Sequence, residues 1–447
     1  MIKKISFILF FIILIFPAGK VFGYPSICPG GVTIDEPSKT YDGYTTFANI
    51  DLETKSDTIY MIDMEGNVVH EWEDIGHTLN NRVLPNGHVY LAMLQPEMGA
   101  MESSKVQGWL QAIVGRDWNN NVIWTYENDH LHHIFDVLPN ENVLALFWGE
   151  LPKELRSQVK GGIPGTEAED GKIYADYVRL IDHNTKETLW EWKTWEGLNI
   201  SNYPLNPIDN RNQWPGINFA KYLPEGNPFN GRESVMISLR RCDTVIIVDM
   251  ETKKVVWEWG KGEISHQHDP QLLDNGNILL LDNGYLRPSS HYAEEKTFSR
   301  IVEVNPSINK IVWEYDGSVP GSMGGLPFFT PFGGFIQRLP TGNTLIAETN
   351  MGRIFEVTPE KEIVWEHYTG KDTDTMFRFT SEESNFPEKL PPARPTGKPL
   401  GGRKIVGGRE IIEKLALPYQ VISILGWVIA ISSLILVIKI KRSKIKE

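Results

Sequence analysis

The stretch His266–Gly284, with the sequence HQHDPQLLDNGNILLLDNG, contains the pattern that decides the fold. Two histidines and a carboxylate begin a strand pattern, the pair Asn275-Gly276 forms a turn, and an Ile/Leu-rich strand follows. Asn-Gly pairs favour tight hairpin turns because Gly accepts positive φ. The stretch therefore predicts a β-hairpin, and its frame recurs along the chain as it does in repeat proteins.

Two signals alternate along the chain. The first is a turn resembling Leu-Pro-Asn-Gly-Asn between two strand patterns, and its copies begin at Leu84, Leu138, Leu223, Leu273 and Leu339. The second is a strand that closes on Trp, usually followed by Glu, and its copies are Val68–Trp72, Val122–Tyr126, Leu189–Trp192, Val255–Trp259, Ile311–Tyr315 and Ile363–His367. Together they predict four strands per roughly 50 to 60 residues, which is the period of a propeller blade.

The six Trp closures predict an all-β fold, a six-bladed β-propeller with four-stranded blades over residues 41–370. The first blade lacks a clear hairpin turn, and its expected strands are Tyr44–Ile50, Thr58–Ile62 and Val68–Trp72. The pattern stops after His367, so residues 371–416 are expected to form an irregular segment and a Pro/Gly-rich stalk, with Leu390–Gly408 as the stalk. A two-sheet sandwich remains the alternative fold.

Both ends of the chain contain apolar segments. Residues 1–23 have a basic start, a short apolar core and a small-residue end, as secretory signal peptides do, and an N-terminal extension (24–40) follows. Residues 417–438 are apolar and long enough to cross a bilayer, and the basic tail 439–447 is expected in the cytoplasm. We therefore expect a membrane-anchored propeller on the extracytoplasmic side. An uncleaved N-terminal anchor and a buried C-terminal core helix are the alternatives.

Charge and cysteine content narrow the possible partners. The formal net charge of −13 argues against a nucleic-acid partner. The chain has two cysteines, Cys28 and Cys242, which could pair in an oxidising compartment. The sequence leaves this pairing open.

The repeat register brings together polar residues that are far apart in the chain. Counting six residues back from the Pro or Asp of each hairpin turn gives Leu79, His133, Asn218, His268 and Gly334. Equivalent positions of a closed repeat point the same way, so His133, Asn218 and His268 should converge on the propeller axis. The alternation of side chains along a strand predicts that His132 points away from His133, whereas His266 shares the direction of His268.

Arg240 ends the second strand of the blade that contains Asn218. The loop after it borders the mouth where the longer loops gather, namely Gln95–Gly108, Gly149–Gly171 and Leu286–Thr297. Guanidinium groups suit oxyanions because they offer several donors in a planar fork. Arg240 is thus a candidate anion-binding residue, and a surface salt bridge is the other interpretation, mainly for Arg241.

At these residues the chain resembles the bacterial-type arylsulfotransferases, over roughly Tyr41 to Tyr368. The resemblance is carried by Gln267-His268-Asp269-Pro270, Leu273–Asn277, Asp282-Asn283-Gly284 and Ser238-Leu239-Arg240. It implies an exported six-bladed propeller that moves a sulfuryl group between phenols without a nucleotide donor. One position departs from the family pattern, because Gly216 stands where the family has a histidine two residues before the asparagine.

The resemblance also implies roles for four residues. His268 matches the histidine that becomes transiently sulfated, His133 a second channel histidine, and Asn218 and Arg240 the groups that bind the sulfuryl oxygens. Sulfuryl transfer needs an in-line nucleophile and donors for the equatorial oxygens, as phosphoryl transfer does. His133 is then the acid and base, the partners are small phenols and aryl sulfates, and no cofactor or metal is needed.

Two other functions remain open from the sequence. The same histidines could bind a divalent metal, since imidazole is a common ligand. Alternatively, the face with the long loops could bind a ligand or a protein without chemistry.

Overall fold

The computed structural model describes residues 30–49, 56–94, 110–285, 287, 298–317, 328–370, 373–380 and 382–395. The predicted signal peptide (1–23), membrane helix (417–438) and basic tail (439–447) lie outside these residues. No helix within the described ranges is long and apolar enough to span a membrane. The membrane-anchored location therefore stays a prediction.

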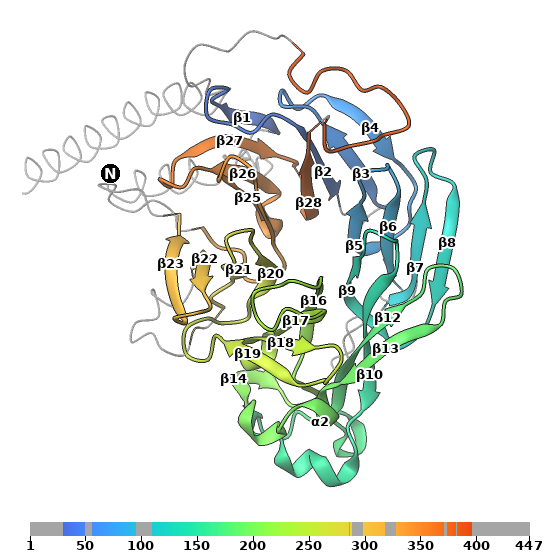
Figure 1. The fold of residues 1–447 in the computed structure, drawn as a ribbon, viewed down its shortest axis with the longest axis vertical. Coiled ribbons are helices and arrows are strands. Elements are labelled where there is room, and N and C mark those ends of the chain that lie inside the picture. Colours follow the sequence, from blue (N-terminus) through green and yellow to red (C-terminus); the bar gives the residue numbers. More distant parts are fainter. Residues whose placement is uncertain are drawn as a thin grey trace, which may run out of the picture.

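Six sheets arranged around one axis form the body of the protein (Figure 1). In the described residues each sheet contains four antiparallel strands, and two sheets carry an extra strand. The strands follow chain order from the axis outwards in five of the sheets, whereas in the sixth the last strand of the chain is the innermost. The prediction of an all-β six-bladed propeller is thereby confirmed. We number the blades I to VI from the N-terminus.

Blades II to VI are built from consecutive strands. Blade II contains β5 (Thr78–Val83), β6 (Val89–Leu94), β7 (Leu110–Arg116) and β8 (Val122–Glu127). Blade III contains β9 (Leu131–Val137), β10 (Val143–Glu150), β12 (Tyr174–Ile181) and β13 (Thr188–Lys193). Blade IV contains β16 (Ile217–Leu223), β17 (Ser234–Leu239), β18 (Thr244–Asp249) and β19 (Val255–Trp259). Blade V contains β20 (His268–Leu272), β21 (Ile278–Asp282), β22 (Arg300–Asn305) and β23 (Lys310–Tyr315). Blade VI contains β24 (Phe335–Arg338), β25 (Thr344–Glu348), β26 (Arg353–Val357) and β27 (Ile363–Tyr368).

Blade I joins the two ends of the propeller. Its three outer strands are β2 (Tyr44–Asn49), β3 (Thr58–Ile62) and β4 (Val68–Trp72), and its inner strand is β28 (Thr373–Phe379). The first blade lacks a hairpin turn because its two innermost strands, β28 and β2, are not consecutive in the chain. The propeller therefore extends past the predicted boundary at residue 370, into the segment expected to be irregular.

Two further segments pack on the closed ring. β1 (Gly31–Asp35) pairs with β27 as a fifth strand of blade VI, so part of the expected N-terminal extension belongs to the propeller. Arg394 forms ion pairs with Asp35 and Asp42, and the Tyr44 hydroxyl donates to the Pro391 carbonyl at 2.5 Å. The expected stalk, Leu390–Gly408, thus lies against the propeller at least through Arg394.

A ring of tryptophan hydrogen bonds links each blade to the next. In every blade a Trp indole N–H from the outer strand donates to an oxygen in the outer turn of the following blade. The pairs, all between 2.7 and 3.1 Å, are Trp72–Asp117, Trp124–His183, Trp190–Met250, Trp192–Lys253, Trp257–Asn309, Trp313–Pro359 and Trp365–Met64. The last pair closes blade VI on blade I. The tryptophans of the repeated Trp-Glu pattern therefore link neighbouring blades through hydrogen bonds. Buried apolar clusters lie between the same neighbouring blades.

The outer turns keep their shape through Asx-type hydrogen bonds. The Asp63 carboxylate accepts from the backbone N–H groups of Glu65 and Asn67, and Asp249 accepts from that of Thr252. The inner hairpins use Gly at positive φ, for example Gly276 at φ 81°. Both turn types follow from the residues that the repeats contain.

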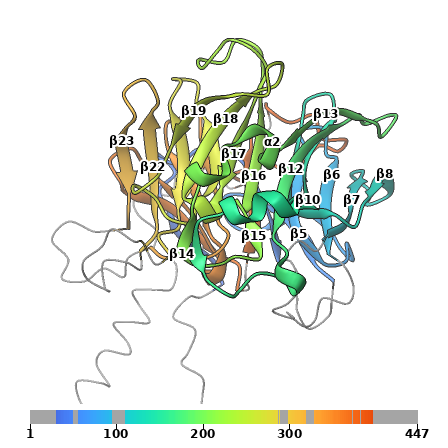
Figure 2. The same ribbon diagram turned by 90° about the horizontal axis from the view of Figure 1, so that it is seen from below.

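One insertion lies within blade III, and a second lies between blades III and IV. The first contains η1 (Lys153–Gln158), β11 (Gly161–Ile163) and η2 (Glu169–Gly171). The second connects blades III and IV and contains α2 (Thr194–Gly197), η3 (Ile200–Asn202), β14 (Leu205–Asn210) and β15 (Gln213–Trp214). β11 pairs with β14 and β15 with β12, both in parallel, so the insertions are fixed to each other and to the blade. Figure 2 shows β14 and β15 below the ends of β16 and β17.

Candidate active site

The four predicted site residues lie on neighbouring blades III, IV and V. His133 is on β9, Asn218 on β16 and His268 at the start of β20, and these inner strands are adjacent around the axis. Arg240 begins the single turn η4 (Arg240–Cys242), which follows β17, and its backbone N–H donates to Gly216 O at 2.9 Å. The propeller thus brings together side chains separated by more than a hundred positions in the sequence.

A β-bulge marks the site end of five inner strands in the described structure. The ladder skips Leu79 on β5, Asn218 on β16 and Thr375 on β28, and it is shifted between His268 and Gln271 on β20 and between Leu131 and Phe135 on β9. In β24 the described ladder has no bulge. Bulges re-aim side chains next to active sites. In blades II to V the position found by counting back from the turns therefore lies at or next to the break in the regular strand.

The bulge on β9 overturns one expectation about direction. Simple alternation predicts that His132 points away from His133, but their Nδ1 atoms lie 2.8 Å apart and their rings meet edge to face. His133 has φ 52°, in the left-handed region, and this local break brings the two adjacent imidazoles together. Period-two alternation holds only in a regular strand.

The hydrogen bonds of His268 determine which of its ring nitrogens is free. Its Nδ1 lies 2.7 Å from Asn283 Oδ1 and 3.1 Å from the His266 carbonyl. The Asn283 amide nitrogen donates to the carbonyls of Thr330 and Gly333, so Oδ1 must face the histidine. Both neighbours of Nδ1 are acceptors, hence Nδ1 carries the proton. Nε2 keeps its lone pair.

Burial keeps both channel histidines neutral. Desolvation, with the nearby charge of Arg240, lowers the pKa of His268 to about 3. The same two causes, together with the other histidines, lower the pKa of His133 well below its usual value. The charge of Arg240 acts on both imidazoles, so the guanidinium lies within electrostatic reach of each.

Arg240 and Arg241 have different surroundings. In the part of the chain that the structure describes, the Arg240 guanidinium forms no hydrogen bond or ion pair, and the side chain is partly accessible. Arg241 is buried, and its Nη1 donates to Asn210 O and Asn212 Oδ1. Arg241 therefore anchors the insertion between blades III and IV, and Arg240 keeps its donors for another group.

Asn218 lies next to the start of β20, and one of its amide hydrogens is already used. It is buried, and its Nδ2 donates to the Gln267 carbonyl at 2.8 Å. Its Oδ1 finds no hydrogen-bond partner among the described residues. Only the second amide hydrogen of Asn218 remains to bind an anion.

The structure gives a reason for Gly216. Its φ is +72°, and a Cβ placed there would stand 2.6 Å from Cγ and 2.7 Å from Cδ of Arg241. A histidine at this position would therefore meet both backbone strain and the Arg241 stem. Its backbone N–H donates to Asp176 Oδ2 at 2.8 Å. Arg241 thus occupies the space that a larger residue at 216 would need.

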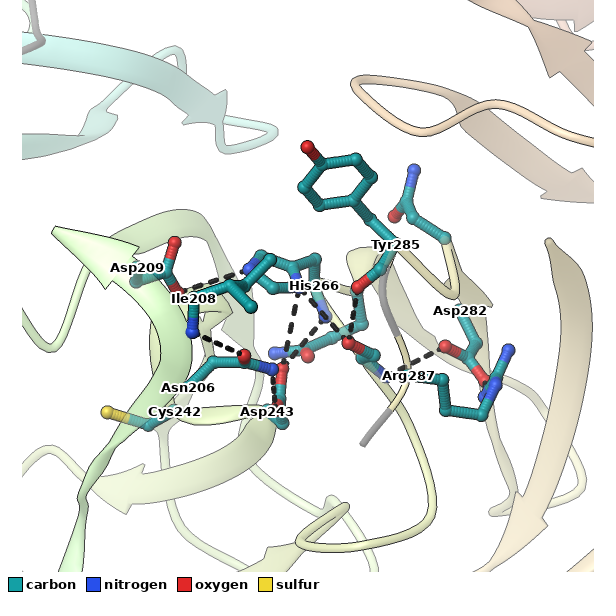
Figure 3. Close-up of polar contacts among 12 residues, drawn as sticks. Asn206, Ile208, Asp209, Cys242, Asp243, His266, Asp282, Tyr285 and Arg287 are labelled. Atoms are coloured by element: carbon teal, nitrogen blue, oxygen red, sulfur yellow. Dashed lines mark hydrogen bonds and ion pairs between the residues drawn. The ribbon is translucent and has the colours of Figure 1, made fainter. Parts of the chain in front are cut away.

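Acidic residues that the sequence reasoning missed surround His266 (Figure 3). Asp209 on β14 lies 3.1 Å from His266 Nε2, and Asp243 accepts from the His266 backbone N–H at 2.9 Å. The Tyr285 ring meets the His266 ring edge to face. Asp209 belongs to an insertion without a counterpart in the other blades, so no repeat register could place it. Asn283 belongs to the quoted Asp-Asn-Gly motif, yet sequence analysis gave it no role.

The described residues also bear on the alternative metal site and on the two cysteines. Within the described ranges no cluster of three or more His, Cys, Asp or Glu residues has the arrangement of a metal site. Cys242 is buried, with Sγ 3.3 Å from the Tyr203 carbonyl, and Cys28 lies outside the described residues.

Comparison with known proteins places the chain in a family. The model of the arylsulfotransferase (ASST) family matches residues 108–370. This match covers more than half of the chain. The protein belongs to the arylsulfotransferase family. The resemblance seen in the sequence is confirmed.

Other comparisons give only distant likenesses. No curated protein matches the chain. Among solved structures, a protein of unknown function from Bacteroides caccae is 11% identical with a TM-score of 0.45, over 76% of this chain and 99% of that one. A catalytically inactive virginiamycin B lyase from Staphylococcus aureus, solved with quinupristin, is 9% identical with a TM-score of 0.36, over 74% and 86%. These values carry no argument about function.

Proposed function

We propose that this arylsulfotransferase-family protein moves a sulfuryl group from an aryl sulfate to a phenol through a covalent sulfohistidine at His268. The observation that carries the proposal is the fixed tautomer of His268. Its Nδ1–H is held by Asn283 Oδ1 and the His266 carbonyl, so Nε2 presents a lone pair. A neutral imidazole with one free nitrogen is a competent nucleophile.

In the first half-reaction, Nε2 of His268 attacks the sulfur of the aryl sulfate as the S–O bond to the phenol breaks. The electron pair of that bond leaves with the phenol oxygen, which takes a proton unless the phenolate is already stable. The pKa of His268, lowered to about 3, keeps the nucleophile unprotonated at neutral pH. Desolvation thus supplies the reactive form without a separate base.

Arg240 supplies the charge that the sulfuryl oxygens need. Its guanidinium forms no hydrogen bond or ion pair with the described residues, and it acts electrostatically on both His268 and His133. A cation whose donors are free can bind the sulfuryl oxygens and stabilise the charge that develops on them in the transition state. The second amide hydrogen of Asn218 adds a weaker, neutral donor.

His133 serves as acid in the first half-reaction and as base in the second. An acceptor phenol gives its proton to His133 while its oxygen attacks the sulfur on His268. The S–N bond then breaks, and the electron pair returns to Nε2. A transfer in two halves through one enzyme form predicts ping-pong kinetics.

The test is transfer between two phenols by the full chain, with 4-nitrophenyl sulfate as donor. We expect parallel lines in double-reciprocal plots and loss of transfer, by roughly 10³-fold or more, in His268→Ala. His130→Ala, which changes an exposed histidine near β9, is the matched control and should keep full activity. Intersecting lines, or an active His268→Ala variant, would contradict the proposal. A wild-type protein that binds but never turns over would favour a binding propeller.

A further inference from the structure

A buried chain of titratable groups stands behind His133. His133 Nδ1 lies 2.8 Å from His132 Nδ1, and His132 Nε2 lies 3.3 Å from Asp176 Oδ1. The His132 and Asp176 side chains are at most 1% exposed. Such a chain of two imidazoles and one carboxylate, ending at the candidate acid and base, has no role in the reaction described so far.

Asp176 is balanced between its two protonation states. Gly216 N and Ile217 N donate to its Oδ2, and the Gln213 side chain donates to its Oδ1. These donors favour the carboxylate, but burial outweighs them and raises the pKa of Asp176 to about 7. Either form is therefore accessible near neutral pH.

His132 cannot hold a positive charge of its own. Burial lowers its pKa to about 3, and its Nε2 makes no aligned hydrogen bond among the described residues. The cations that act on these groups are Arg241, near both Asp176 and His133, and Arg240, near His133. Both arginines disfavour a cation on His133, and burial disfavours one on His132. A proton that enters at His133 is thus driven towards Asp176.

We infer that Asp176, acting through His132, stores the proton that His133 exchanges with the phenols, and that it positions His133 in one tautomer for each half-reaction. The inference rests on the proposed function. Asp176 and His132 touch no substrate, so they are positioning residues. One buried carboxyl thus sets which nitrogen of His133 is protonated.

The proton balance of the chain is complete in both directions. Before donor binding, Asp176 is protonated, its O–H faces His132 Nε2, His132 Nδ1–H faces His133 Nδ1, and His133 Nε2 carries the proton for the leaving phenol. As that proton leaves, each group passes one proton along, and Asp176 becomes a carboxylate. His133 then has Nδ1–H and a free Nε2, which accepts the proton of the incoming phenol. Transfer to the acceptor returns the chain to its first state.

Asp176→Asn separates the two halves of this cycle. The Asn amide N–H would face His132 Nε2 permanently, which keeps His133 protonated at Nε2, as in the acid state. We expect sulfation of His268 by 4-nitrophenyl sulfate to stay within about twofold of wild type. Transfer to a phenol of ordinary pKa, about 10, should fall by roughly 10²-fold or more.

The acceptor itself supplies the decisive readout. An electron-poor phenol that is already ionised in the assay needs no base, so Asp176→Asn should transfer to it at nearly the wild-type rate. A structural lesion would slow both acceptors equally, and that result would overturn the inference. His132→Gln, which breaks the chain at its middle without touching Asp176, should show the same dependence on the acceptor. It replaces Asp176→Asn if that variant fails to fold.

The design distinguishes the inference from the function on which it rests. If wild-type protein forms no sulfohistidine, the proposed function fails. If wild-type protein is sulfated and active while both variants retain transfer to ordinary phenols, only the proton chain is wrong.

Discussion

The outer edge of the propeller and the inner ends of its blades use the same repeat in opposite ways. At the outer edge every blade repeats one interaction, a Trp indole that donates to the next blade's turn. At the inner ends, equivalent register positions carry Leu79, His133, Asn218, His268 and Gly334, and the ladder bulges in blades II to V. The repeated hydrogen bond links the blades of the ring, whereas the candidate site lies where the residues of the repeat differ from blade to blade.

Removing a buried tryptophan from the outer ring should have the largest effect on stability. Trp365 is fully buried and donates to Met64 O, across the junction between the last blade and the first. We expect Trp365→Ala to lower the free energy of unfolding by about 3 to 5 kcal/mol, because a large buried side chain and a hydrogen bond are both lost. Urea unfolding followed by fluorescence measures this change.

The control for that experiment is Trp257→Ala, where the indole is partly exposed and donates to an exposed Asn309 side chain. Trp257→Ala should lower the free energy of unfolding clearly less than Trp365→Ala. Equal losses in the two variants would show that ring closure has no special energetic weight. The folded fraction of either variant should keep the sulfation rate of wild type.

A glycine at the inner end tests the crowding around Arg241. Gly216→Ala introduces a Cβ at positive φ and within 2.6 Å of the Arg241 Cγ. We expect a loss of about 1 to 3 kcal/mol of stability, since strain and overpacking add. Gly226→Ala is the matched control, because its φ is +88° but nothing lies within 4 Å of the new Cβ. If both variants lose the same stability, the contact with Arg241 contributes nothing.

Removing the side-chain oxygen that accepts the hydrogen bond of His268 Nδ1 should have a smaller effect. Asn283→Ala removes the side-chain oxygen that fixes the Nδ1–H tautomer of His268, although the His266 carbonyl remains. The sulfation rate should fall roughly tenfold because the free nitrogen is less well defined. Rapid-quench measurement of the sulfated fraction gives this rate, and an unchanged rate would remove Asn283 from the account.

The sulfation rate should depend very little on pH. Since the pKa of His268 is lowered to about 3, its imidazole stays neutral when the pH falls from 8 to about 5. The sulfation rate with 4-nitrophenyl sulfate should therefore be flat over that range. An imidazole with an ordinary pKa of about 6.5 would lose roughly tenfold by pH 5.5. Such a loss would contradict the buried, neutral state of His268.

The contrast between the repeated outer edge and the varied inner ends explains which parts of the fold and of the candidate site the sequence could predict. The repeat predicted the blades, the turns and the register positions of His133, Asn218 and His268, because repeated residues have repeated environments. It could not predict β28 as the inner strand of blade I, since one copy of a strand far from its sheet leaves no periodic signal. Asp209 and Asp176 were also beyond reach. The first lies in a unique insertion, and the second becomes notable only through burial and through the bulge that turns His132 towards it.

The most direct test of the central claim is the intact mass of the full chain after incubation with 4-nitrophenyl sulfate and a quench without acid. We expect a gain of one SO₃ unit per chain, mapped by peptide sequencing to His268, and no gain in His268→Ala. We also expect the adduct to disappear when a phenol is added. An adduct on another residue, or turnover without any adduct, would contradict the sulfohistidine mechanism.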